Sequence, residues 1–99
     1  MQMATFKLTG ASTVTTPPPT QYTVNLSWKA SSSANIVGYN VYRSTISGGY
    51  YGLVGSTTGT LSFADNTVQA GITYYYVTTA VNNQGMDSPY SNQVVATVP

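Results

Sequence analysis

The stretch "GITYYYVTTAV", residues 71–81, places three consecutive tyrosines inside a run of residues that favour β-strands. Successive side chains of a strand point to opposite faces of its sheet, so the run divides into two alternating sets. One set is Tyr74, Tyr76, Thr78 and Ala80, and the other is Tyr75, Val77, Thr79 and Val81. The alternation predicts a long strand, but it does not say which set faces the core.

The rest of the chain also reads as strands separated by turns. In "QYTVNLSWK", residues 21–29, every second residue is apolar, which is typical of a half-buried strand in an antiparallel sheet. Its apolar face holds Tyr22, Val24, Leu26 and Trp28. Further strands are predicted at 36–44, 50–54, 60–65 and 91–99, and in the first of these we expect Val37, Tyr39 and Val41 on the core face. No stretch shows the period of an amphipathic helix, so one all-β sandwich is the simplest architecture.

The 99 residues fit a single domain, but the start of the chain allows two interpretations. A first strand is expected near 14–16, just before Pro17, Pro18 and Pro19, because proline lacks a backbone donor and cannot continue a central strand. The segment "ATFKLTG", residues 4–10, also has the pattern of a strand. Residues 1–10 therefore either belong to an irregular first strand, which we favour, or form a linker or the tail of a preceding domain.

The small number of charged residues argues against several classes of partner. Only 5% of the residues are charged and the net charge is +1, with Lys7, Lys29 and Arg43 scattered along the sequence. Binding to nucleic acid requires clustered cations and is therefore not expected. Every apolar run is broken within a few positions by a polar residue or glycine, so we expect no membrane insertion.

The sequence also lacks the residues of common catalytic and metal sites. It has no histidine or cysteine, and Asp65 and Asp87 are its only acidic residues. Nucleophile–histidine–acid sites, paired glutamates and transition-metal sites therefore cannot form, and we expect neither enzyme activity nor a cofactor. Asp65 with Asn66 would make only a weak calcium site. We interpret both aspartates as turn residues that accept hydrogen bonds from nearby backbone.

Several segments together resemble a fibronectin type III domain of the bacterial extracellular type. They are "VNLSWKA" with Trp28, "VGYNVYRS" with Tyr39, "FADNTVQAGITYYYVTTAVNNQG" and the closing "SPYSNQV", and they span residues 20–98. The resemblance implies a seven-stranded antiparallel Ig-like β-sandwich whose core contains Trp28 and Tyr39.

The same resemblance gives the tyrosine run a structural role. The family places an aliphatic residue, a glycine and an alanine at fixed distances from a corner tyrosine, and this pattern is matched by Val68, Gly71, Tyr74 and Ala80. Tyr74 would then bury its ring and bond through its hydroxyl to backbone near Val68. Tyr76 would follow it into the core, and Tyr75 would point outward. Thr78 departs from the pattern: its buried hydroxyl would need a partner such as a local backbone carbonyl, unless the register is shifted by one residue.

By function, the resemblance implies a non-catalytic spacer or interaction module of a larger secreted or surface-anchored bacterial protein. Its partners would be the neighbouring domains of the parent chain. We expect the module to be monomeric and to be located outside the cell or at its surface, with the secretion signal beyond this stretch of sequence.

Two other functions remain open. Exposed tyrosines stack on sugar rings and also contact proteins, so the module could bind a polysaccharide or another protein. The candidate residues are Tyr50, Tyr51, Asn83 and Met86, together with the loops at 30–35, 57–60 and 82–88. Tyr42, Tyr75 and Tyr90 are also expected to be exposed, although tyrosines favour strands for packing alone. The other alternative is a binding scaffold with engineered loops.

Overall fold

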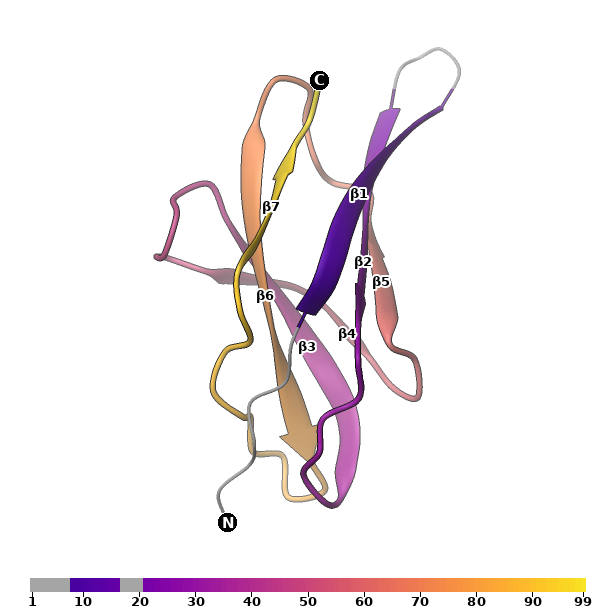
Figure 1. Cartoon of the computed structure of the whole chain (residues 1–99), viewed down its shortest axis with the longest axis vertical. Coiled ribbons are helices and arrows are strands. Elements are labelled where there is room, and N and C mark those ends of the chain that lie inside the picture. Colours follow the sequence, from indigo (N-terminus) through magenta and orange to yellow (C-terminus); the bar gives the residue numbers. More distant parts are fainter. Residues whose placement is uncertain (1–7, 17–20) are drawn as a thin grey trace.

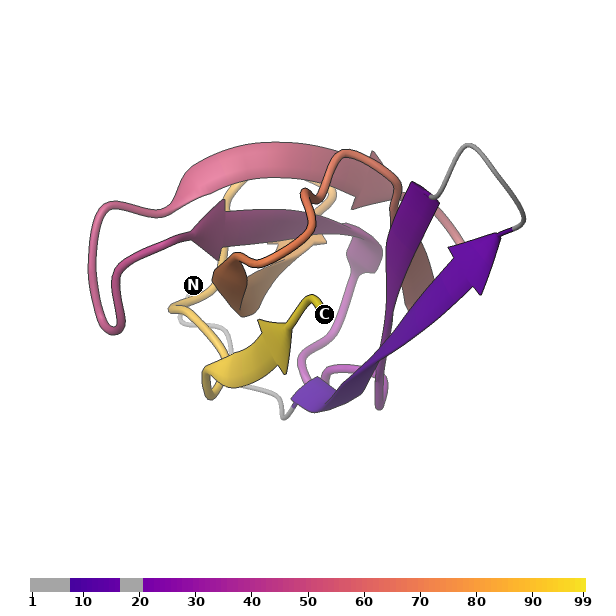
Figure 2. The ribbon, with the colours of Figure 1, turned by 90° about the horizontal axis from the view of Figure 1, so that it is seen from above.

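Seven strands form two antiparallel sheets in a computed structural model that describes residues 8–16 and 21–99 (Figure 1). The strands are β1 (Leu8–Thr16), β2 (Gln21–Trp28), β3 (Ile36–Ser44), β4 (Gly52–Thr57), β5 (Ser62–Asp65), β6 (Thr73–Asn82) and β7 (Val94–Thr97). One sheet has the order β1-β2-β5 and the other the order β4-β3-β6-β7, and Figure 2 looks down on both. Within the described ranges there is no helix that could cross a membrane. The predicted seven-stranded sandwich is confirmed.

The first, fourth and last strands differ most from their predicted bounds. β1 joins residues 8–10 and 14–16 in one strand that pairs with β2, with an irregularity between Leu8 and Gly10. Residues 8–10 therefore extend the first strand, whereas residues 1–7 and the three prolines lie outside the described part of the chain. β4 covers 52–57 instead of 50–54, and β7 begins at Val94 instead of residue 91.

The core lies between the apolar faces of the two sheets. β2 contributes Val24, Leu26 and Trp28, each at most 3% exposed, as the alternation of this strand predicts. The facing sheet contributes Tyr39, Val41, Tyr74, Tyr76, Ala80 and Ala96. The ring centroids of Trp28 and Tyr39 lie 5.5 Å apart, so aromatic side chains from both sheets are in contact in the core.

The sequence predicts Val37 on the core face, and this prediction is wrong. Ile36 pairs with Asn82 while Gly38 pairs with Val81, so β3 carries one extra residue opposite β6 at this point. This bulge reverses the alternation of β3. Ile36 packs against the core instead, and Val37 is 53% exposed.

Most of the stretch 71–81 forms β6, and its side chains alternate between the two faces as the resemblance implies. Tyr74, Tyr76, Thr78 and Ala80 are buried on the core face, whereas Tyr75 is half-buried. Val77 and Thr79 alternate with these core residues, yet they are only 2% exposed. The middle of β6 is therefore buried on both faces, which a single alternation could not indicate.

The hydroxyl of Tyr74 fixes the connection between β5 and β6. It accepts a hydrogen bond of 2.9 Å from the backbone N–H of Gln69, the residue after Val68. Gly71 lies between them with a φ of 79°, a conformation that favours glycine. The N–H of Gly71 also donates to the carbonyl of Val98 at 3.1 Å. This corner therefore also holds the segment that follows β7.

Thr78 finds its partner in the segment between β6 and β7, and not in a local backbone carbonyl. The Thr78 hydroxyl donates to Ser91 Oγ at 3.1 Å, and the Thr78 N–H donates to the same oxygen at 2.9 Å. Ser88 Oγ accepts from the N–H of Ala80 in the same way, at 2.9 Å. Hydroxyl groups thus replace backbone carbonyls beside β6, where Pro89 interrupts a regular strand.

Replacing Tyr74 with phenylalanine should lower the free energy of unfolding by about 1–3 kcal/mol, because the N–H of Gln69 loses its acceptor while the ring stays buried. Tyr75→Phe is the matched control, since the hydroxyl of half-buried Tyr75 forms no hydrogen bond with a described residue. That change should have little effect. Urea denaturation, monitored by tryptophan fluorescence, measures the free energy of unfolding of both variants. Equal losses would contradict the assignment of Tyr74 as the corner residue.

Candidate functional site

The residues predicted for the core are together in the structure, whereas those predicted for binding are not. The buried cluster includes Trp28, Tyr39, Val68, Tyr74, Tyr76 and Ala80. Tyr50 is 90% exposed in the hairpin between β3 and β4, and Tyr51 beside it is half-buried. Asn83 and Met86 are exposed in the turn after β6, at a different end of the molecule (Figure 1). The four predicted binding residues therefore do not form one site.

A different set of aromatic residues gathers on the outer face of the β4-β3-β6-β7 sheet. Tyr90, in the segment between β6 and β7, meets Tyr42 of β3 and Tyr51 edge-on, with ring centroids 5.4 and 5.3 Å away. Gln93 Oε1 accepts hydrogen bonds from the Tyr51 hydroxyl and from the N–H of Gly48, which fastens the β3–β4 hairpin to this group. We call Tyr42, Tyr51 and Tyr90 the tyrosine cluster.

Asp87 links the segment between β6 and β7 to strands β3 and β6. Its Oδ2 accepts hydrogen bonds from Thr79 Oγ1 at 2.8 Å, from the Tyr42 hydroxyl at 3.0 Å and from Asn40 Nδ2 at 3.1 Å. Burial opposes ionisation of this carboxyl, but the three donors outweigh burial and lower the pKa of Asp87. Burial and the nearby carboxylate both raise the pKa of Tyr42. Asp87 is thus an acceptor held by two strands, and its interpretation as a turn residue is wrong.

The sequence offers one signal for this site. "DSPY", residues 87–90, puts an acid, a proline and an aromatic residue at the end of the predicted loop 82–88. A proline there indicates that the chain does not continue as a regular strand, but nothing local shows that Tyr42 lies opposite.

Asp65, the second acid, lies buried between the two sheets. Its Oδ2 accepts hydrogen bonds from the Tyr76 hydroxyl at 2.7 Å and from Arg43 Nη1 at 2.9 Å. Its Oδ1 accepts from the N–H and the hydroxyl of Thr67, at 3.0 and 2.6 Å. The bond from the Thr67 N–H is the turn interaction that the sequence predicts. The ion pair with Arg43 and the bond from Tyr76 are additional, and local sequence does not reveal them.

These donors determine the chemistry of Asp65. Burial alone would raise the pKa of its carboxyl, but the hydrogen bonds from Thr67 and Tyr76, together with Arg43, lower it. Burial and the adjacent carboxylate raise the pKa of Tyr76 far above the usual value. A carboxylate has about four lone-pair positions, and four donors already occupy them, so a calcium ion would have to displace a protein group. In residues 8–16 and 21–99 no group of three potential metal ligands is found.

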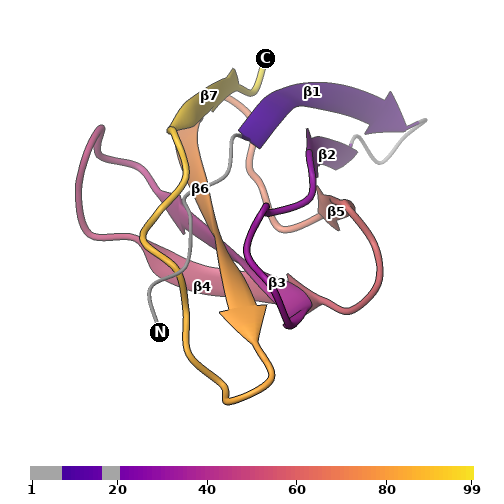
Figure 3. The same ribbon diagram turned by 60° about the horizontal axis from the view of Figure 1, so that its bottom comes forward.

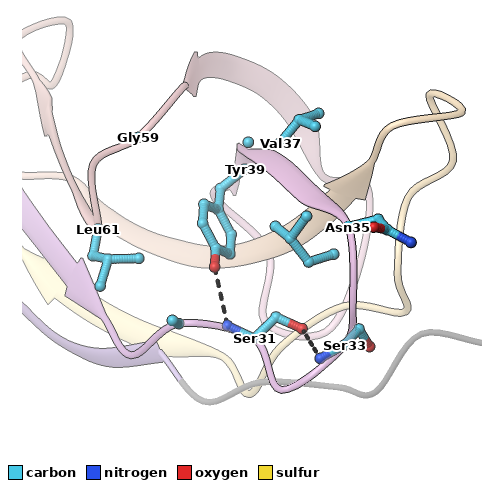
Figure 4. Close-up of a pocket in the computed structure, with 10 residues that line it drawn as sticks. Ser31, Ser33, Asn35, Val37, Tyr39, Gly59 and Leu61 are labelled. Carbon is cyan, nitrogen blue, oxygen red and sulfur yellow. Dashed lines mark hydrogen bonds between the residues drawn. The ribbon is translucent and has the colours of Figure 1, made fainter.

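The predicted binding loops lie together at one end of the sandwich (Figure 3). A hollow is found at this end (Figure 4). It has a volume of about 550 Å³ and is lined by residues of the β2–β3 and β4–β5 loops and the start of β3, none of them charged. The Ser31 N–H donates to the Tyr39 hydroxyl at 3.0 Å, and the Ser33 N–H donates to Ser31 Oγ at 3.2 Å. Part of its polar lining is therefore bonded within the protein.

From pH 7 downward, the stability of the fold should change only in strong acid. A carboxyl whose pKa is lower in the folded state stabilises the protein above its unfolded-state value of about 3.9, and this contribution is lost as the pH falls through the folded-state pKa. Because histidine and cysteine are absent, we expect the free energy of unfolding to stay level from pH 7 to about pH 5 and to fall below about pH 4. Urea denaturation at each pH, with NMR titration of the two aspartate carboxyls, tests this. A loss beginning above pH 5, or a carboxyl pKa at or above the ordinary value, would contradict it.

Comparison with known proteins finds relatives within larger bacterial proteins. No family model matches the chain. It is 42% identical over 73 residues to an amylopullulanase of Thermoanaerobacter thermohydrosulfuricus, a match that covers 74% of this chain and 5% of that protein. A β-1,2-glucanase of Parabacteroides distasonis shares the fold, with a TM-score of 0.79 at 24% identity over 98% of this chain and 13% of the glucanase.

One similar structure matches the chain over almost its whole length. It is the crystal structure of an Fn3-like protein from Clostridium thermocellum, with 33% identity and a TM-score of 0.72 over 97% of this chain and 96% of that one. The two sheets and the tyrosine corner agree with this match. The chain belongs to the fibronectin type III-like family.

Proposed function

We propose that the chain is a non-catalytic module that holds neighbouring domains of a larger bacterial protein at a fixed separation. The observation that carries this proposal is the match to a segment that makes up only 5% of an amylopullulanase. So small a share of a large enzyme is more compatible with an accessory module than with the catalytic part.

The two acids support the absence of catalysis. Each carboxylate is held by side-chain donors, and each has a lowered pKa. A carboxyl of this kind is ionised at neutral pH and is therefore a poor general acid, and its donors also make it a weak base. Asp65 is in addition only 2% exposed and cannot meet a substrate.

The contacts between the sheets support a spacing role. Asp65 joins them through Arg43 and Tyr76, and the corner at Tyr74 fixes the crossing from one sheet to the other. A module with a single packed core keeps its two neighbouring domains at a fixed distance, whereas a flexible linker lets that distance vary.

The names of the relatives support a location outside the cell. An amylopullulanase and a β-1,2-glucanase act on glucans, and polymers of that kind do not cross membranes. We therefore propose a secreted or surface-anchored parent protein, with the module itself monomeric and in contact with adjacent domains.

A spacing experiment tests this function. The chain is placed between two fluorescent proteins, and single-molecule energy transfer gives the distribution of distances between them. We expect one narrow distribution, because the inserted module is folded and rigid. A Gly/Ser linker of equal length is the control, and it should give a broad distribution around a root-mean-square length of about 50–60 Å.

Two results would contradict the proposal. A distribution as broad as that of the control linker would show that the module does not fix the separation. If the purified chain released reducing ends from soluble glucans faster than buffer alone, the module would have catalytic activity.

A further inference from the structure

The outer face of the β4-β3-β6-β7 sheet carries a small hollow beside the tyrosine cluster. Its volume is about 290 Å³, and it is lined by Tyr42, Thr79, Asp87, Ser88, Pro89 and Tyr90. We call it the tyrosine groove. Ligand pockets begin at about 300 Å³, so the groove has room for one ring-sized group and not for a larger folded element.

The walls of the tyrosine groove combine an aromatic surface with hydroxyl groups. Tyr90 forms one side and remains 48% exposed although it also contacts Tyr42 and Tyr51. Because both neighbours meet it edge-on, they fix the orientation of its ring. The axial C–H groups of a pyranose ring form an apolar face that can lie against such an aromatic ring.

Asp87 supplies a hydrogen-bond acceptor to the groove. Thr79, Tyr42 and Asn40 all donate to its Oδ2, and no described residue donates to its Oδ1. The carboxylate is therefore held in a fixed orientation while one of its oxygens can still accept. A ligand hydroxyl that donates to this oxygen would form a charge-assisted hydrogen bond.

The charge at the groove restricts the ligand further. Asp87 is the one charged side chain among the described residues that line it. A polyanion would place like charge next to this carboxylate, whereas a neutral polyhydroxylated ligand would not. The groove is also small, unlike the larger dehydrated surface that a protein hot spot requires.

We propose that the tyrosine groove binds one pyranose unit of a neutral glycan, with the sugar ring against Tyr90 and a sugar hydroxyl donating to Asp87. This site overlaps the predicted binding surface only in part: Asp87 and Ser88 belong to the predicted loop 82–88, but Tyr50, Asn83 and Met86 do not line the groove. It goes beyond the spacing role and does not depend on it: a rigid spacer need not bind a sugar, and a sugar-binding module need not fix a distance.

NMR titration of the ¹⁵N-labelled chain tests the site directly. Maltohexaose and cellohexaose are added to millimolar concentration, with tetragalacturonic acid as the anionic control. We expect a neutral oligosaccharide to shift the amide signals of Thr79, Asp87 and Tyr90. Tetragalacturonic acid should bind at least several-fold more weakly.

Variants assign the binding to individual side chains. Tyr90→Ala should weaken binding at least about fivefold, the lower end of what a stacked aromatic ring contributes, and Tyr90→Phe should retain it. Asp87→Asn should weaken it as well, because a charged acceptor is lost. Tyr50→Ala is the matched control: Tyr50 is an exposed tyrosine outside the groove and its loss should have no effect. Dispersed amide signals establish that each variant is folded.

Several outcomes would overturn the proposal. If no groove amide shifts with either neutral oligosaccharide at 10 mM, the tyrosine cluster is a packing or protein-contact surface and not a sugar site. Shifts centred on the β3–β4 hairpin and lost in Tyr50→Ala would place the site elsewhere. Tighter binding of tetragalacturonic acid would contradict the ligand class.

Discussion

The arrangement of the two sheets depends above all on the buried carboxylate of Asp65. Asp65 ends β5 in one sheet, while Arg43 and Tyr76 reach it from β3 and β6 of the other. The side chain of Asp65 is 2% exposed, so without these donors it would be an uncompensated charge in the core. The sheets therefore have to pack so that the donors of one reach the acceptor of the other.

Arg43 extends this constraint to the tyrosine corner and, through β6, to the surface. Its guanidinium carbon lies 4.8 Å from the centroid of the Tyr74 ring, which is a cation–π contact. The core face of β6 is thereby fixed, and the alternation of the strand places Thr79 on the outer face. There Thr79 donates to Asp87, beside Tyr90. One strand thus supplies both the bond between the sheets and the floor of the tyrosine groove.

The sequence predicts strands well where burial repeats every two residues, as it does in β2. The corner at Tyr74 follows from the resemblance to a family, with Gln69 as its partner. Alternation fails at Val37, where an extra residue in β3 reverses the faces. It also cannot reveal contacts between distant residues: Asp87 is held by Tyr42, which lies 45 residues earlier. Much of the core could therefore be predicted. The tyrosine groove could not, because its lining residues come from segments that are far apart in the sequence.

The most direct test of the role of Asp65 is the free energy of unfolding of Asp65→Asn at pH 7, measured by urea denaturation beside Asp87→Asn. Both substitutions keep the size of the side chain and remove one negative charge. Loss of the buried negative charge leaves Arg43 without its ion-pair partner, so we predict a loss of about 3 kcal/mol or more for Asp65→Asn. The exposed Asp87→Asn should lose less than about 1 kcal/mol. Equal losses in the two variants, or an Asp65→Asn protein as stable as the wild type, would contradict the central place of this carboxylate.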